Sequence, residues 1–437
     1  MFSNQVVVTG IGLVSALGGL KPSWQRLLAG ESSIKRHQPF PDLPSRPLAL
    51  INQTSTSSLE ELIELAVAEA LQDAALEMPL PDCGVVIGSS RGCQASWEQL
   101  AREMRGDRGM GGWGDGEMGR WGDGRQGREG RQGRQGRQGG DKGDIDTHLF
   151  PIPNSQFPIP NSQTTNLEHW LELLPHQAAI TTARQVGTFG PVLAPMAACA
   201  TGIWSIAQGF ELIQTGCCQR VIAGAVEAPV TPLTIAGFDK MGVLATTGAY
   251  PFARYREGLV LGEGAAVLIL ESADLALSRE VPIYGQLLGF GLTSDAAHAT
   301  SPSRDRQSAI AAVKQCLERS HITPAAIDYI HAHGTGTQLN DQNEAELIEK
   351  LFPQGVPISS TKGATGHTLG TSGALGAVFC LMALKHQLLP PCVGLQESDF
   401  DLDLVLTPRQ CEVQQVLNFS FGFGGQNAVM ALGRFFT

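Results

Sequence analysis

The sequence predicts an α/β fold, because β-branched segments with strand character alternate with segments of helical periodicity along most of the chain. Its 437 residues exceed one small module, and a content of 42% apolar and 17% charged residues is typical of a chain with a large buried core. In the N-terminal part, QVVVTGI (5–11) and CGVVIGSS (83–90) are strand candidates. Between them, residues 57–76 place leucine, isoleucine and alanine at helical spacing after serine caps and predict a helix.

The same alternation returns beyond about residue 190. We expect helices at 201–216, 308–320 and 373–387. The predicted strands are rich in β-branched residues, and glycine marks many of their ends. They are 219–227, 265–271, 282–291, 326–334, 356–361, 413–420 and 427–435.

A polar insertion at about 106–166 interrupts this pattern. Between residues 106 and 143 lie 16 of the 52 glycines, RQG or REG recurs every three residues, and FPIPNSQ later occurs twice in succession. Such a tract cannot offset its ordering entropy by burial, so we expect a mobile, dispensable surface loop. RNA binding is the alternative, although no aromatic residue is interleaved among the arginines of the repeat.

Charge and cysteine usage restrict the partners and the compartment. A net charge of −11 argues against nucleic acid or an anionic membrane as partner. The nine cysteines show no C-x-x-C spacing, so a disulfide framework or a thiolate zinc site is not expected. Because no signal-like start and no run of 18 apolar residues is present, we expect a cytoplasmic protein.

Cys199 is the first candidate for chemistry. It lies in LAPMAACATG, where an apolar run gives way to a predicted helix, and a helix N-terminus lowers the pKa of a thiol and favours thiolate. A strained turn between strand and helix is also a common way to expose a nucleophile. The alternative is a small core residue.

Two glycine-rich loops add histidines and a lysine. HAHGTGT contains His331 and His333, and STKGATGHTLG contains Lys362 and His367. Alternation puts His331 and His333 on one face of a strand, so either could be structural, but His333 is nearer the loop and is the better catalytic candidate. Metal binding is the rival interpretation, although no H-x-x-x-H accompanies these residues. With a final loop, NFSFGFGG, able to offer N–H groups to an oxyanion, the set predicts acyl transfer through a thioester.

These motifs carry a family resemblance. VVVTGIGLVSALG, AACATG, REGLVLGEGAA, HAHGTGT, STKGATGHTLG and NFSFGFGG occur in this order, and the chain resembles the β-ketoacyl-acyl carrier protein synthases of the elongating type II kind (KAS II-like) in the thiolase superfamily. The resemblance implies a thiolase-like five-layered α-β-α-β-α fold made of two duplicated halves. We expect 1–245 to carry the nucleophile and the insertion, and 246–437 to carry the histidines and the lysine.

The resemblance also implies a reaction. Cys199 would take an acyl chain from acyl carrier protein, and His333 and His367 would drive malonyl decarboxylation and stabilise the enolate oxygen. The product would be a 3-oxoacyl chain two carbons longer. Lys362 would act electrostatically, paired with Glu344.

Further roles follow from the same likeness. The N–H groups of Cys199 and Phe423 would form the oxyanion hole, with the Phe423 side chain as acyl gate. Thr335 and Thr337 would bind the phosphopantetheine arm, and Asp341 with Glu344 would support the site. We expect acyl carrier protein as partner, a homodimer, and neither a separate cofactor nor a metal.

Several positions depart from the family pattern and leave alternatives open. The family usually has glutamate, threonine, threonine and aspartate where this chain has Gly376, Gln426, Ala197 and Ala253. One alternative is a non-catalytic partner subunit, although such subunits typically lose the cysteine. Another is elongation on a polyketide or glycolipid pathway. Thiolase chemistry with coenzyme A is disfavoured because two histidines, rather than a second cysteine, complete the site.

Overall fold

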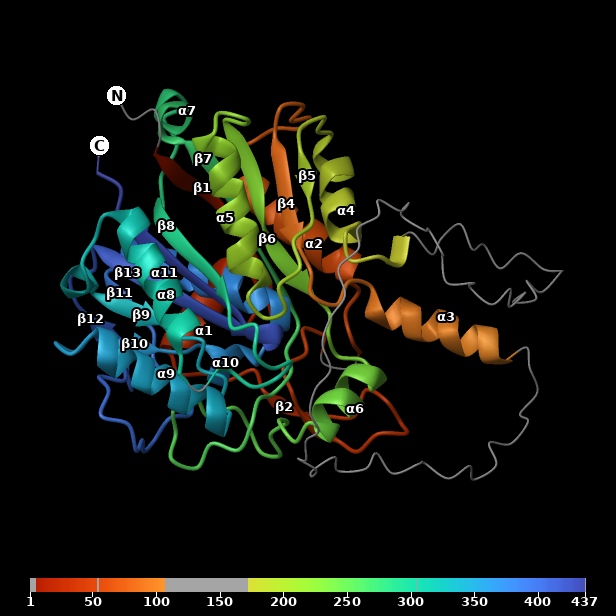
Figure 1. Cartoon of the computed structure of the whole chain (residues 1–437). Helices are drawn as coiled ribbons and strands as arrows, with labels where there is room; N and C mark the ends of the chain where they lie inside the picture. Colours follow the sequence, from red (N-terminus) through yellow and green to blue (C-terminus); the bar gives the residue numbers. More distant parts are fainter. Residues whose placement is uncertain (1–4, 53–54, 107–171, 304, 437) are drawn as a thin grey trace, which may run out of the picture.

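The computed structural model describes residues 5–52, 55–106, 172–303 and 305–436. The predicted mobile insertion at about 106–166 lies almost wholly outside these described residues. Within them, a continuous ten-stranded sheet runs β10-β9-β13-β14-β8-β1-β7-β6-β4-β5 (Figure 1).

The first half of the sheet is built by β1, β4, β5, β6 and β7. These strands are Val6–Ser15, Gly84–Gly88, Val192–Leu193, Arg220–Glu227 and Gly264–Ser272. β4 runs parallel to β5 and β6, and β7 runs antiparallel to β6 and β1. Its helices are α1 (Leu20–Leu28), α2 (Leu59–Asp73), α3 (Gln94–Gly106), α4 (Gln177–Val186), α5 (Thr201–Gln214), α6 (Pro232–Lys240) and α7 (Ala273–Ser278).

The second half repeats this pairing strand for strand. Its strands are β8 (Gly285–Ser294), β9 (Tyr329–His331), β10 (Ile358–Ser359), β13 (Gln415–Gly422) and β14 (Gln426–Gly433). β9 is parallel to β10 and β13, and β14 is antiparallel to β13 and β8. Its helices are α8 (Gln307–Ser320), α9 (Gln338–Leu351), α10 (Lys362–Thr365) and α11 (Ser372–His386).

This repeat confirms the predicted fold of two duplicated halves. By strand pairing the second half begins at β8, later than the expected division between 245 and 246, because β7 still completes the first set of strands. Two small hairpins lie outside the main sheet: β2 (Lys35–His37) with β3 (Arg46–Leu48), and β11 (Leu388–Leu389) with β12 (Arg409–Gln410).

Helices α5 and α11 occupy equivalent places in the two halves and pack against each other between the two halves of the sheet. Their contact is close because it uses glycine: a Cβ at Gly202 would lie 2.4 Å from the Ala374 nitrogen. Helices α2 and α4 cover the outer face of the first half, and α8 covers that of the second. The result is five layers in the order α-β-α-β-α.

Local sequence explains the best-formed helices. The Ser58 side chain accepts from the Glu61 N–H and caps α2, as the serine pattern predicts. The run Leu369–His386 is long and apolar enough to cross a membrane, but 89% of it is buried inside the protein, so its composition is that of a core helix.

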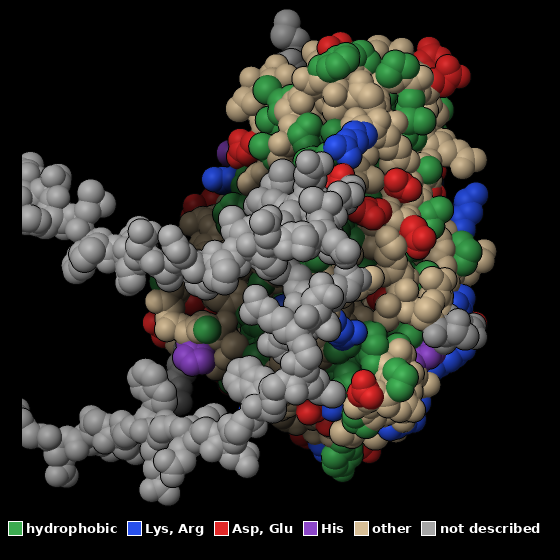
Figure 2. All heavy atoms as spheres, turned by 90° about the vertical axis from the view of Figure 1, so that its right-hand side faces the viewer, with side chains coloured by type: hydrophobic (Ala, Val, Ile, Leu, Met, Phe, Trp, Pro, Cys, Tyr) green, Lys and Arg blue, Asp and Glu red, His purple; other side chains and the backbone are tan. Residues whose placement is uncertain are grey.

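Figure 2 shows the face of the molecule on which β5 and α4 lie. The described part of this face carries apolar side chains between scattered acidic and basic ones.

Candidate active site

Cys199 lies in the tight turn that leads into α5. The residue before it, Ala198, has φ +48°, a left-handed conformation that costs a non-glycine residue on the order of 1–3 kcal/mol. Thr201 holds the turn: its hydroxyl accepts from the Ala197 N–H at 2.9 Å and donates to the Ala198 carbonyl at 2.7 Å. The predicted strained turn before a helix is therefore confirmed.

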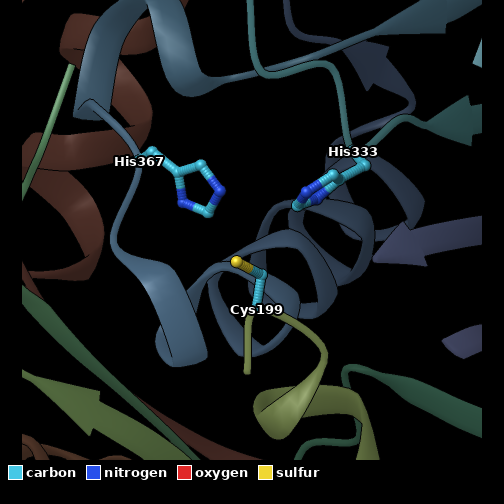
Figure 3. Close-up of side chains that lie close together, drawn as sticks. All are labelled: Cys199, His333 and His367. Atoms are coloured by element: carbon cyan, nitrogen blue, oxygen red, sulfur yellow. The ribbon is translucent and has the colours of Figure 1, made fainter. Parts of the chain in front are cut away.

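Two loops bring histidines to this thiol. His333 follows β9 and His367 follows α10, and both side chains point toward Cys199 (Figure 3). The Cys199 Sγ and one ring nitrogen from each histidine all lie within 4.8 Å of one another. The two rings are nearly perpendicular, with centroids 5.3 Å apart. The structure thus brings together three residues that are separated by 134 and 34 positions in the sequence.

Hydrogen bonds decide which nitrogen of each ring carries the proton. Nδ1 of His367 accepts from the Leu369 N–H at 3.0 Å and is 3.1 Å from the Ser372 hydroxyl. Nδ1 of His333 lies 3.4 Å from the Lys362 ammonium, which is a donor. Each ring therefore presents a protonated Nε2 to the cavity.

Both rings are neutral. Burial lowers the pKa of His333 and of His367 well below 6.5, and the Lys362 charge lowers both further. A neutral imidazole with a protonated Nε2 donates well to an oxyanion. A metal ion would instead need the Nε2 lone pair, so this donor set fits metal ligation poorly.

The Cys199 thiol is not acidified. Burial raises its pKa to about 11, although the Lys362 charge and the Phe423 N–H oppose this rise. The prediction of a lowered pKa is wrong, because Cys199 belongs to a buried apolar cluster with Phe238 and Leu369, and desolvation disfavours the thiolate more than the helix terminus favours it.

Lys362 and Glu344 serve His333 in different ways. The Lys362 Nζ contacts the His333 carbonyl oxygen, and burial lowers the pKa of this lysine. The Glu344 carboxylate accepts from the His333 and Gly334 N–H groups at 2.6 and 2.7 Å. No direct contact within 4 Å joins the two groups among the described residues, but the charge of each acts on the other: Glu344 raises the pKa of Lys362, and Lys362 lowers that of Glu344.

Asp341 supports the next part of the same loop. Its buried carboxylate accepts from the Phe252 N–H at 2.8 Å and from the Thr335 N–H at 3.0 Å. The Thr335 and Thr337 hydroxyls lie 2.9 Å apart. Both threonines line a cavity of about 380 Å³, together with Cys199, the two histidines and Phe423.

The last loop closes the site over Cys199. The Phe423 N–H opposes the rise in the pKa of the Cys199 thiol, and the Ser420 hydroxyl donates to the Cys199 carbonyl at 2.8 Å. A Cβ at Gly422 would lie 3.0 Å from the Cys199 nitrogen, so this approach favours glycine. The Phe423 ring stacks on Phe238, with centroids 5.9 Å apart.

Sequence reasoning missed Phe238 and Glu227. Glu227 ends β6 and is wholly buried; it accepts from the Ser90 N–H and, at 3.3 Å, from the Ser89 hydroxyl. Burial raises its pKa to about 7. Its place as the one acidic residue at the end of an otherwise apolar predicted strand was the sequence signal that could have identified Glu227. The Phe238 segment offered none.

A buried thiol facing two neutral imidazoles, beneath a glycine-rich loop, is an arrangement that suits acyl transfer. Comparison with known proteins agrees. The models "Beta-ketoacyl synthase, N-terminal domain" and "Beta-ketoacyl synthase, C-terminal domain" match residues 158–276 and 284–396. The chain belongs to the beta-ketoacyl synthase family. This family condenses substrates carried on the phosphopantetheine of acyl carrier protein, without a separate cofactor.

Curated relatives and solved structures cover nearly the whole chain. The "3-oxoacyl-[acyl-carrier-protein] synthase 2" of Staphylococcus aureus (strain COL) is 29% identical over 99% of both chains. A beta-ketoacyl synthase from Burkholderia phymatum STM815 superposes with TM-score 0.80 at 25% identity, over 99% of this chain and 100% of that one. "The ishigamide ketosynthase/chain length factor" gives TM-score 0.81 at 25% identity with the same coverage.

Proposed function

We propose that this protein is a 3-oxoacyl-acyl carrier protein synthase of the elongating KAS II type, which acts in fatty acid biosynthesis in the cytoplasm. It joins an acyl chain held on Cys199 to malonyl-acyl carrier protein by decarboxylative Claisen condensation. The observation that carries this proposal is the convergence of the Cys199 sulfur with two neutral histidines whose protonated Nε2 atoms face the cavity.

The first step loads the thiol. The Cys199 sulfur attacks the thioester carbon of acyl-acyl carrier protein, a new C–S bond forms, and the bond to the pantetheine sulfur breaks. The thiol proton ends on that departing sulfur. The N–H groups of Cys199 and Phe423 stabilise the oxyanion that develops on the thioester oxygen.

The second step makes the carbon–carbon bond. The bond between the malonyl carboxylate and C2 breaks, carbon dioxide leaves, and the electron pair forms an enolate whose oxygen accepts from Nε2 of His333 and His367. C2 then attacks the Cys199 thioester carbon, and the sulfur departs as thiolate. Because its pKa is raised to about 11, this thiolate readily regains a proton from solvent.

The cavity suits a pantetheine arm. Thr335 and Thr337 line it on the path to Cys199, and their hydroxyls can meet the amides of the arm. Glu344 and Asp341 hold the loop that carries both threonines. These contacts support acyl carrier protein as the partner that delivers both substrates.

A specialised ketosynthase of a polyketide or glycolipid pathway is the second candidate. One neighbour of similar fold is titled as a ketosynthase with a chain length factor, which supports this candidate. A non-catalytic partner subunit is less well supported, because Cys199, both histidines and Lys362 are all present and lie close together.

We also propose a homodimer formed through β5. This strand ends the sheet, and large apolar side chains around it are exposed: Phe189 by 92%, Met196 by 64% and Val192 by 40%. An exposed apolar edge strand favours pairing with another chain. A second copy would extend the sheet and cover these side chains.

The test supplies malonyl-acyl carrier protein with acyl-acyl carrier proteins of 8 to 16 carbons and identifies products by mass spectrometry. Full-length protein should yield 3-oxoacyl thioesters two carbons longer, and Cys199→Ala should yield none. A single extension favours fatty acid elongation, and repeated extension without reduction favours the polyketide role. No condensation with any primer would overturn the proposal.

A further inference from the structure

A third histidine, His331, is buried beside the site without a part in the reaction. It ends β9, is 2% exposed, and stacks on Phe379 with ring centroids 6.5 Å apart. Its Nε2 lies 3.1 Å from the Thr361 hydroxyl. On the neighbouring strand, Asn418 is its direct partner in the β13·β9 register, so the two side chains lie next to each other.

The other ring nitrogen of His331 and the Asn418 amide oxygen are neighbouring buried atoms without hydrogen-bond partners. The Asn418 Nδ2 donates to the Gly373 carbonyl at 2.7 Å, which identifies Oδ1 as the remaining acceptor. Among the described residues, Asn418 Oδ1 and His331 Nδ1 each lack a hydrogen-bond partner, and no hydrogen bond joins the two atoms. Buried polar atoms of this kind are strongly driven to pair.

Gly376, in α11, lies directly against both of these atoms. A Cβ at Gly376 would lie 2.3 Å from Asn418 Oδ1 and 2.8 Å from His331 Nδ1. Both atoms therefore contact α11 at a position that has no side chain. Any side chain at Gly376 would force Asn418 and His331 to move. The departure from the family pattern at Gly376 is thus explained by its close contact with Asn418 Oδ1 and His331 Nδ1.

We propose that His331 is a positioning residue for the condensation: as a neutral ring with the proton on Nδ1, it donates to Asn418 and accepts from Thr361, and so ties three active-site segments together. This tautomer is the opposite of that of His333 and His367. Burial and the Lys362 charge lower the pKa of His331 to about 3, which agrees with a ring that stays neutral.

Each partner of His331 leads directly to a residue of the site. His331 itself lies two residues before His333. Thr361 precedes Lys362 at the N-terminal end of α10, and His367 follows that helix. Asn418 lies two residues before Ser420, whose hydroxyl holds the Cys199 carbonyl. One imidazole therefore joins the two segments that carry the catalytic histidines to β13, whose Ser420 contacts the Cys199 carbonyl. This inference rests on the proposed function for its kinetic consequences, but not for its tautomer.

The tautomer is tested first, on full-length protein labelled with ¹⁵N-histidine. Long-range ¹H–¹⁵N correlation spectra distinguish the two neutral tautomers, and the signal lost in His331→Phe assigns His331. We expect the Nδ1-protonated pattern for His331. An Nε2-protonated pattern would overturn the inference, whether or not the protein proves to be a condensing enzyme.

The kinetic test uses a mutant cycle. His331→Ala should lower kcat for malonyl decarboxylation by about tenfold or more, with little change in KM. Gly376→Ala should lower both kcat and the thermal midpoint. In the double variant His331→Ala/Gly376→Ala, the space left by the imidazole accommodates the added methyl group. The thermal midpoint should therefore recover while kcat stays low. Recovery of kcat together with the midpoint, or wild-type kcat in His331→Ala, would refute a positioning role.

Discussion

The Leu369 N–H donates a hydrogen bond to Nδ1 of His367 across 3.0 Å. Because a backbone amide can only donate, this contact fixes the His367 proton on Nε2, the nitrogen that faces the cavity. The protonated Nε2 on which the proposed role of His367 depends is therefore set by a backbone contact within its own loop.

Replacing His367 should remove one of the two donors to the enolate. We expect His367→Ala to lower the rate of malonyl decarboxylation by about 10²–10³-fold, the usual effect of losing one oxyanion donor. Release of carbon dioxide from labelled malonyl-acyl carrier protein measures this. Ser372→Ala is the matched control: it removes the second contact to Nδ1 but leaves the Leu369 N–H, so its rate should fall only a few-fold. Equal losses in both variants would contradict the role of Leu369.

The depressed pKa of His367 predicts a loss of stability in acid. Below pH 6.5 the unfolded chain binds a proton that the folded His367 refuses, so the free energy of unfolding falls by about 1.4 kcal/mol per pH unit for this residue. Above pH 6.5 the contribution of this residue is constant. Urea titrations at pH 7.5 and 5.5 should therefore show His367→Asn losing about 1.4 kcal/mol less than wild type. The same loss in both proteins would refute a neutral, buried His367.

Lys362 should control the acidity of the nucleophile. Its charge lowers the pKa of Cys199, so Lys362→Met should raise that pKa and slow alkylation of Cys199 by iodoacetamide several-fold at pH 8. Lys362→Arg keeps the charge and should slow alkylation less. Rates measured from pH 7 to 10 with peptide mapping provide the test; unchanged alkylation in Lys362→Met would show that this charge does not reach the sulfur.

Replacing Phe423 should separate the role of its backbone N–H from the role of its aromatic ring. Phe423→Ala keeps the N–H that opposes the rise in the pKa of the Cys199 thiol but removes the ring that stacks on Phe238. We expect acylation of Cys199 to persist and the preference among 8- to 16-carbon chains to broaden. Competition between chain lengths, read by intact-protein mass, measures this. Loss of acylation at every length would show that the ring itself is needed.

Much of the fold could be predicted, because its strands and helices carry strong local patterns. The predicted helix at 57–76 and the strand at 219–227 correspond to α2 and β6. The strand predicted at 5–11 extends to Ser15, because β7 pairs with it along its whole length. By contrast, the strand predicted at 326–334 shrinks to Tyr329–His331, because the following residues leave the sheet to form the catalytic loop.

The site was predictable in its residues but not in its electrostatics. Motifs identified Cys199, His333 and His367, and the structure places them together. The pKa of Cys199 could not be predicted, because it depends on apolar neighbours such as Leu259 that are remote in sequence. The contacts that Lys362 and Glu344 make with the backbone of the His333 loop likewise depend on how that loop folds.

The most direct test of the central claim is the mass of the protein after exposure to acyl-acyl carrier protein without malonyl substrate. We expect one added acyl group, located on Cys199 by peptide mapping, discharged when malonyl-acyl carrier protein is added, and absent in Cys199→Ala. An adduct on another residue, or no adduct with any chain length while Cys199 remains reactive to iodoacetamide, would contradict it.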